Sequence, residues 1–123
     1  MRVGLLTSYF KNEKAAAYLT LPIMKRYCSI RGYTLVVGVG MSADGMYDGV
    51  SGTLDPHGRR GDDQYETATL FLPIWSVIMD PRVKFEHLGK DQRLAPPGLA
   101  VICATLADVR DAIATAPWLK GYL

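Results

Sequence analysis

Three consecutive side chains near the start of the sequence can contact a ligand: Thr7, Ser8 and Tyr9. They follow the apolar residues 3–6, which are typical of a short buried strand. Open sheets of parallel strands bind their ligands at the carboxyl ends of the strands. The sequence therefore predicts a ligand-binding site around these three residues.

A second group of candidate residues lies in residues 38–64, a stretch that contains seven glycines. His57 is the best candidate for a general acid or base, because an unperturbed imidazole has a pKa of about 6.5. Arg59 and Arg60 could neutralise phosphate groups, although a basic pair in a loop is also typical of a solvated surface. We predict that this stretch faces the first group across a pocket. A loop of this length is either functional or disordered.

The sequence lacks the common motifs that hold phosphates and metals. No GxGxxG motif follows the first apolar run, and no GxxxxGK[ST] motif occurs. Cys28 and Cys103 lie in apolar surroundings 75 positions apart, and there is no cluster of cysteine and histidine. Asp62 and Asp63 are adjacent, and their position is typical of a helix cap. We predict neither a metal ion nor a cofactor.

Residues 1–38 have the pattern of a βαβ unit, which would place the first candidate group at the end of a parallel strand. A stripe of apolar residues at helical spacing follows the first strand. We expect the helix to begin near Leu21, because Pro22 is tolerated only in a first turn. Gly32 is a typical helix stop, and residues 33–39 alternate as a second strand.

Capping boxes mark two further helices. The first begins at Asp63 and predicts a helix over residues 65–79, which Pro73 either kinks or divides. The second begins at Thr105 and predicts a helix that ends before Pro117.

Residues 83–88 alternate as a short strand, and the continuous apolar residues 99–104 are typical of a buried strand. The hydrophobic residues 118–123 are expected to pack on this domain or on another copy of the chain. The predicted fold is therefore one small α/β domain over residues 1–123. It has a mostly parallel sheet of three to four strands flanked by about three helices.

The composition is ordinary for a globular protein, with 49% hydrophobic and 21% charged residues. The net charge of +2 does not require a nucleic acid or a membrane as partner. Basic residues are concentrated in residues 1–43, which hold six of them and one acidic residue. Such a face could meet phosphates, but a solvated face is the commoner explanation. We expect a cytoplasmic protein with reduced thiols, no nucleic acid partner, and assembly as a homo-oligomer.

Four short motifs in residues 1–38 resemble the opening of GT-A type, nucleotide-sugar-dependent glycosyltransferases. They are Leu5-Leu-Thr-Ser-Tyr9, Leu19-Thr-Leu-Pro22, Arg26-Tyr-Cys28 and Arg31-Gly-Tyr-x-Leu-Val36. The resemblance implies that Thr7, Ser8 and Tyr9 contact a nucleotide, with the ring of Tyr9 able to stack on a base. That family holds the donor diphosphate through a metal bound to an Asp-x-Asp pair, which this sequence lacks. The expected function is therefore binding of a nucleotide or nucleotide-sugar, without a prediction of catalysis.

Two alternatives stand beside this hypothesis. The first strand, the Tyr-Cys helix and residues 48–53 (Asp-Gly-Val-Ser-Gly-Thr) are similar to serine recombinases, which implies Ser8 as a nucleophile for DNA strand exchange. A non-enzymatic domain that binds a small ligand or assembles as a symmetric dimer fits the length of the chain and its interface-type side chains.

Overall fold

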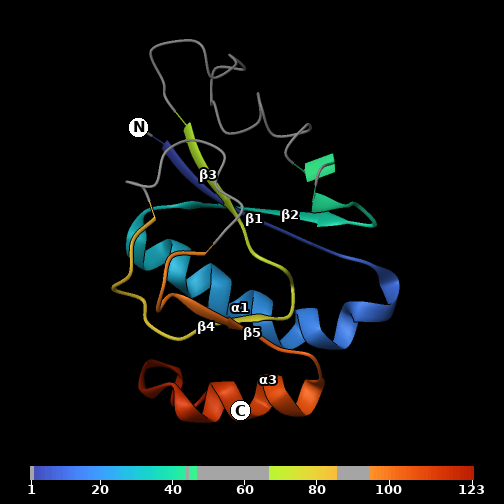
Figure 1. The fold of residues 1–123 in the computed structure, drawn as a ribbon, viewed down its shortest axis with the longest axis vertical. Coiled ribbons are helices and arrows are strands. Elements are labelled where there is room, and N and C mark those ends of the chain that lie inside the picture. Colours follow the sequence, from blue (N-terminus) through green and yellow to red (C-terminus); the bar gives the residue numbers. More distant parts are fainter. Residues whose placement is uncertain (1, 44, 47–66, 86–94) are drawn as a thin grey trace.

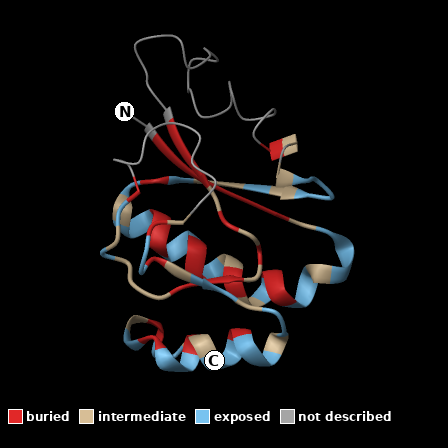
Figure 2. Cartoon of the chain, in the orientation of Figure 1, coloured by how far each residue is buried: buried red, intermediate tan, exposed pale blue. Residues whose placement is uncertain are grey.

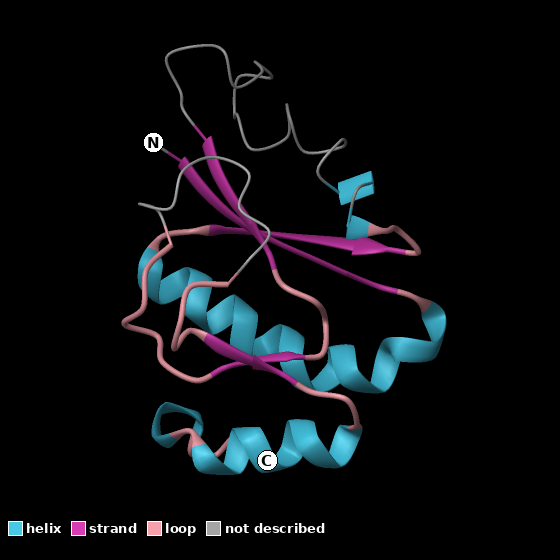
Figure 3. Ribbon diagram, viewed as in Figure 1, coloured by secondary structure: helices cyan, strands magenta, loops and turns pink. Residues whose placement is uncertain are grey.

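The computed structural model describes residues 2–43, 45–46, 67–85 and 95–123 (Figure 1). Over these residues the fold is a small α/β fold, in which a three-stranded parallel sheet and a two-stranded antiparallel sheet pack with the helices α1 and α3 (Figure 3). The elements in chain order are β1 (Arg2–Tyr9), η1 (Lys11–Glu13), α1 (Lys14–Arg31), β2 (Thr34–Val39), β3 (Thr67–Phe71), β4 (Ser76–Ile78), β5 (Ala100–Ile102), α3 (Leu106–Thr115) and η2 (Pro117–Leu119).

Strand β1 is the centre of the parallel sheet, whose order is β2-β1-β3. It runs parallel to both neighbours, so the predicted βαβ unit is confirmed. Helix α1 packs against β1 and β2 on one side and against α3 and β4 on its other side. All the described carboxyl ends of the parallel strands therefore lie at one edge of the sheet.

Helix α1 is longer than the sequence predicts. We expected it to begin near Leu21, but it begins at Lys14 and carries Pro22 in its interior. Pro22 is exposed, so water can reach the backbone carbonyl that proline leaves without an intrahelical partner. The predicted end is confirmed: Gly32 adopts φ 74°, and its N–H donates to the carbonyl of Cys28.

The predicted helix over residues 65–79 is wrong, because the described part of this segment forms β3, a connection and β4. Ala68, Leu70 and Leu72 are buried at the spacing of two that a strand requires. A short apolar run that is buried on both faces has no period that distinguishes a strand from a helix. Pro73 lies in the connection between the two strands, where it interrupts no ladder of hydrogen bonds. Asp63 lies outside the described residues.

The strand expected over residues 99–104 is confirmed over Ala100–Ile102, but it is not buried. Among the described residues β5 pairs only with β4, so it forms an edge. Val101 is 44% exposed and Ile102 is 65% exposed. Residues 83–85 are not in a strand, contrary to expectation, and residues 86–88 lie outside the described part of the chain.

The capping box before α3 is confirmed. The hydroxyl of Thr105 accepts the Asp108 N–H at 3.1 Å, and the Asp108 carboxylate accepts the Thr105 N–H at 3.2 Å. The segment that follows α3 packs on its own domain, which is the first of the two predicted alternatives. Leu119 is 1% exposed, and the Trp118 indole N–H donates to the carbonyl of Ile78 at 2.9 Å.

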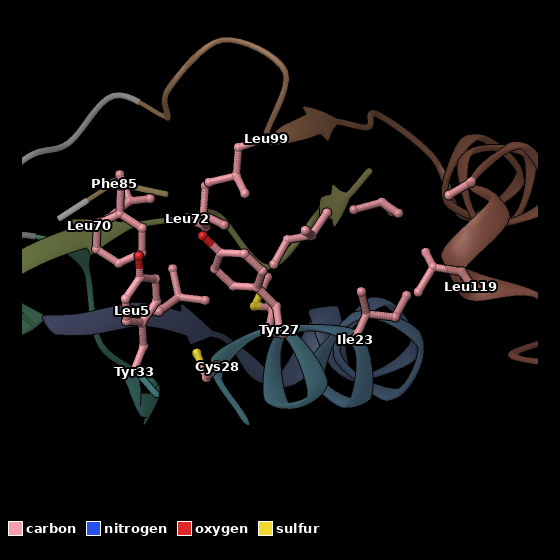
Figure 4. Close-up of a cluster of buried hydrophobic side chains, with 14 of the residues drawn as sticks. Leu5, Ile23, Tyr27, Cys28, Tyr33, Leu70, Leu72, Phe85, Leu99 and Leu119 are labelled. Atoms are coloured by element: carbon pink, nitrogen blue, oxygen red, sulfur yellow. The ribbon is translucent and has the colours of Figure 1, made fainter. Parts of the chain in front are cut away.

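The main hydrophobic core joins α1 to the parallel sheet and also to β4 and α3 (Figure 2). Figure 4 shows Tyr27 of α1 among Leu5, Leu70 and Leu72 of the sheet region and Leu99. Each of these five side chains is at most 1% exposed. The core therefore fixes β1 on the side that faces α1.

Candidate functional site

The last three residues of β1 extend past the end of β3. On the β3 side the register ends with Leu6 opposite Phe71, and the Leu72 N–H donates to the carbonyl of Leu6 at 2.9 Å. On the β2 side pairing continues through Thr7, Ser8 and Tyr9, which lie opposite Val37, Gly38 and Val39, respectively. The predicted ligand site therefore lies where β1 has only one neighbouring strand among the described residues.

The three predicted contact residues do not share one face of the sheet. Leu5 belongs to the core beneath α1, whereas Leu6 packs with Met46. Because side chains alternate along a strand, Thr7 and Tyr9 lie on the α1 face and Ser8 lies on the opposite face. A ligand at this edge would meet Ser8 from one side of the sheet and Tyr9 from the other.

The α1 face of the site is closed by protein side chains. Thr7 is fully buried, and its hydroxyl has no hydrogen-bond partner among the described residues. Tyr9 is half-buried against a cluster formed by Ala16, Ala17 and Ile74. The ring of Tyr9 therefore has one packed side, and only its remaining surface can stack on a base.

The opposite face is shaped by a glycine. Gly38 lies in register with Ser8, and a Cβ atom at Gly38 would collide with the sulfur of Met46. Met46 is 3% exposed and packs on Leu6. Gly38 therefore allows residue 46 to come close to the sheet beside Ser8. A glycine inside an alternating strand often marks such a close approach, which is the signal that could have identified this position.

The turn from β1 into α1 is held by Glu13, a residue that the sequence did not single out. Its carboxylate accepts the Phe10 N–H at 3.0 Å and the Trp75 indole N–H at 2.7 Å. Phosphate groups commonly bind at the first turn of the helix that follows a strand. Here a protein carboxylate occupies that turn, so an anionic ligand would be repelled toward the β2 side of the site.

On its β2 side, the site is bordered by backbone groups. Gly40 has φ 71°, a conformation that favours glycine, and its N–H donates to the carbonyl of Tyr9 at 2.8 Å. This bond joins the ends of β1 and β2 just beyond the last strand pair, Tyr9 and Val39. The chain leaves the sheet at this point, next to the residues predicted to contact a ligand.

The second group of predicted site residues, His57, Arg59 and Arg60, lies outside the described residues. The pocket that we predict between this group and the end of β1 therefore stays a prediction. Within residues 2–43, 45–46, 67–85 and 95–123, no group of three or more His, Cys, Asp or Glu side chains could hold a metal ion. No helix in the same part of the chain is long and apolar enough to cross a membrane.

Comparison of the chain with protein-family models, with characterised proteins and with solved structures found no significant match.

Proposed function

We propose that this domain binds a nucleotide or nucleotide-sugar at the carboxyl end of β1. The observation that carries the proposal is the position of Ser8. It lies at the carboxyl end of the central strand of a parallel sheet, beyond the end of β3. This is the place in an open α/β sheet where ligands bind.

The chemistry of the edge suits a polar ligand with an aromatic base. The hydroxyl of Ser8 can donate and accept hydrogen bonds to a ribose or a phosphate. The exposed part of the Tyr9 ring can stack on a base. The Glu13 carboxylate directs the phosphates away from α1, and the predicted role of Arg59 and Arg60 is to neutralise them. We propose binding, without a catalytic step.

A thermal-shift screen with nucleotides and nucleotide-sugars, with and without Mn²⁺, tests the proposal. A ligand at 100 times its Kd adds about 2.7 kcal/mol of stability, which raises the melting midpoint of a domain of this size by several degrees. Because the sequence has no Asp-x-Asp pair, we expect the shift without Mn²⁺ as well.

The variants Ser8→Ala and Ser76→Ala form a matched pair. Both remove a buried hydroxyl from a strand, but Ser76 lies in β4, which pairs with β5 in the antiparallel sheet. We expect the ligand-induced shift to be lost in Ser8→Ala and kept in Ser76→Ala. A flat screen on folded protein, or an equal loss in both variants, would overturn the proposal.

A homo-oligomeric interaction module is the second candidate, and the edge strand β5 favours it. Exposed apolar side chains on an unpaired strand edge are a template for pairing with another chain. Val101 and Ile102 present such a surface. If β5 forms the contact, Ile102→Lys should lower the solution mass of the assembly to that of a monomer. An unchanged mass in the folded variant would exclude this edge.

A further inference from the structure

The outer face of α1 and the end of the chain enclose a shallow groove that the proposed function does not use. Tyr18, Leu19 and Pro22 of α1 line one side, and Gly121 and Tyr122 line the other. The cavity between them measures about 440 Å³, within the usual range for ligand sites. Tyr18 is 83% exposed, so the face of its ring is open to a ligand.

An arginine lies beside the aromatic residues of this groove. The Arg26 guanidinium lies 5.6 Å from the centre of the Tyr122 ring and 5.8 Å from that of Trp118. One of its nitrogens is 3.5 Å from the Tyr122 hydroxyl. These contacts hold the cation in place while its charge remains at the surface.

The α1 side of the groove is basic, whereas α3 carries Asp108, Arg110 and Asp111. Helix α1 contains Lys14, Lys25, Arg26 and Arg31 and no acidic residue. Residues 112–123 contain Lys120 and no acidic residue. Lys14 and Lys25 are exposed and lie four and seven positions from Tyr18, which places them on the same side of the helix. The groove therefore combines the exposed ring of Tyr18 and the half-buried ring of Tyr122 with the basic side chains of α1, which favours anionic ligands.

A second cavity shares Gly121 with this groove. This cavity of about 470 Å³ lies against the end of α3, and its lining includes Pro117, Lys120 and Leu123. Gly121 lines both cavities, so they adjoin at this residue. Gly121 has φ 96°, and a Cβ atom there would meet nothing within 4 Å. The combined trough suits a chain-like ligand better than a single small molecule.

We propose that this trough binds single-stranded nucleic acid. Bases stack on the rings of Tyr18 and Tyr122, while Lys14, Lys25, Arg26 and Lys120 contact phosphates. Aromatic platforms along a positively charged groove are the features by which proteins hold single strands without reading their sequence. We predicted no nucleic acid partner from the net charge of +2, but that total hides the concentration of basic residues on α1.

Fluorescence anisotropy with a labelled 12-nucleotide oligothymidine or oligouridine strand in 50 mM salt tests the proposal. Three variants separate stacking from charge: Tyr18→Phe keeps the ring, Tyr18→Leu keeps only an apolar side chain, and Arg26→Gln removes a charge. Because Tyr18 is 83% exposed, neither change at this position should unfold the domain. Lys84→Gln is the control, since Lys84 is an exposed basic residue outside the trough.

We expect Tyr18→Leu to weaken binding about fivefold or more and Tyr18→Phe to bind within twofold of the unaltered chain. Arg26→Gln should reduce the slope of log K against log salt by about 0.7, and Lys84→Gln should bind as the unaltered chain does. Ser8→Ala should also leave this binding unchanged, so failure of this proposal is distinguishable from failure of the nucleotide site.

Three results would overturn the inference. The first is no retention of either strand at 50 mM salt. The second is equal affinity in Tyr18→Leu and Tyr18→Phe, because stacking would then contribute nothing. The third is equal affinity for a duplex of the same length, because contacts with phosphates alone would then explain the binding.

Discussion

Leu5 and Leu6 are neighbours in β1, and both are fully buried, yet their surroundings differ. Leu5 lies in the main core with side chains from α1, β3 and the segment before β5. Leu6 packs with Met46 and with the partly buried Val36 and Phe71. The α1 face of β1 therefore holds the fold together, and the opposite face carries Ser8, whose hydroxyl we propose to contact the ligand.

Aromatic side chains connect several elements on the α1 face. The rings of Tyr27 and Tyr33 meet edge to face at 5.7 Å, and those of Tyr33 and Phe85 lie 4.6 Å apart. The Tyr27 hydroxyl donates to the carbonyl of Val83. These contacts join α1, the start of β2 and the segment after β4, so a change on this face affects several elements at once.

The largest expected effect comes from truncating the two leucines separately. We expect Leu5→Ala to lower the free energy of unfolding by about 4 kcal/mol and Leu6→Ala by about 2.5 kcal/mol, because a cavity in a densely packed core cannot collapse. Urea denaturation of both variants measures the difference. Equal losses would show that the two faces of β1 contribute alike and would break the comparison.

The next largest effect is a fall in the free energy of unfolding at alkaline pH, caused by a buried thiol of α1. Burial raises the pKa of the Cys28 thiol to about 12, compared with about 8.5 for an exposed thiol. The pKa of the Cys28 thiol is higher in the folded state than in the unfolded state. The stability gained by burying the neutral thiol is therefore complete below about pH 8.5. It is lost by about 1.4 kcal/mol per pH unit as the pH rises toward 12.

Urea denaturation between pH 8 and pH 11 measures this loss. In Cys28→Ala the free energy of unfolding should fall less steeply with pH than in the unaltered chain. Cys103→Ala is the matched comparison. Burial raises the pKa of the Cys103 thiol as well, but this side chain is only half-buried, so the slope should change less than in Cys28→Ala. If both variants keep the original slope, burial of Cys28 does not govern the alkaline loss.

The smallest effect is expected at Glu13, where the α1 face of the site is closed. Glu13→Ala removes the acceptor of two hydrogen bonds and should lower the free energy of unfolding by about 2 kcal/mol. Glu13→Gln keeps one acceptor oxygen and should lose less. Trp75 fluorescence reports the change directly, since its indole N–H donates to this carboxylate. An unaltered emission spectrum in Glu13→Ala would contradict the role assigned to this contact.

Several features of the fold were predictable because their signals are local. The apolar alternation of β2, the Gly32 stop and the capping box of Thr105 each depend on residues close in sequence. The segment that became β3 and β4 was not predictable in this way. Its strands are specified by pairing with β1 and β5, more than twenty residues away in each case, and its apolar run has no distinctive period.

The candidate site, too, was predictable only where its features depend on residues close in sequence. The polarity of Ser8 at the end of an apolar strand was visible in the sequence. The contact of Gly38 with Met46 and the bond from Trp75 to Glu13 were not, because they depend on how distant segments meet in three dimensions. Such contacts follow from tertiary packing and have no local pattern.

An NMR titration of the ¹⁵N-labelled protein with UDP-glucose and GDP-mannose, and with UDP and GDP alone, tests the central claim most directly. We predict that the amide signals of Ser8, Gly38 and Gly40 shift with one nucleotide class, while those of Tyr18 and Gly121 in the trough do not. Shifts confined to Tyr18 and Gly121, or no shifts with any of the four compounds, would contradict a nucleotide site at the end of β1.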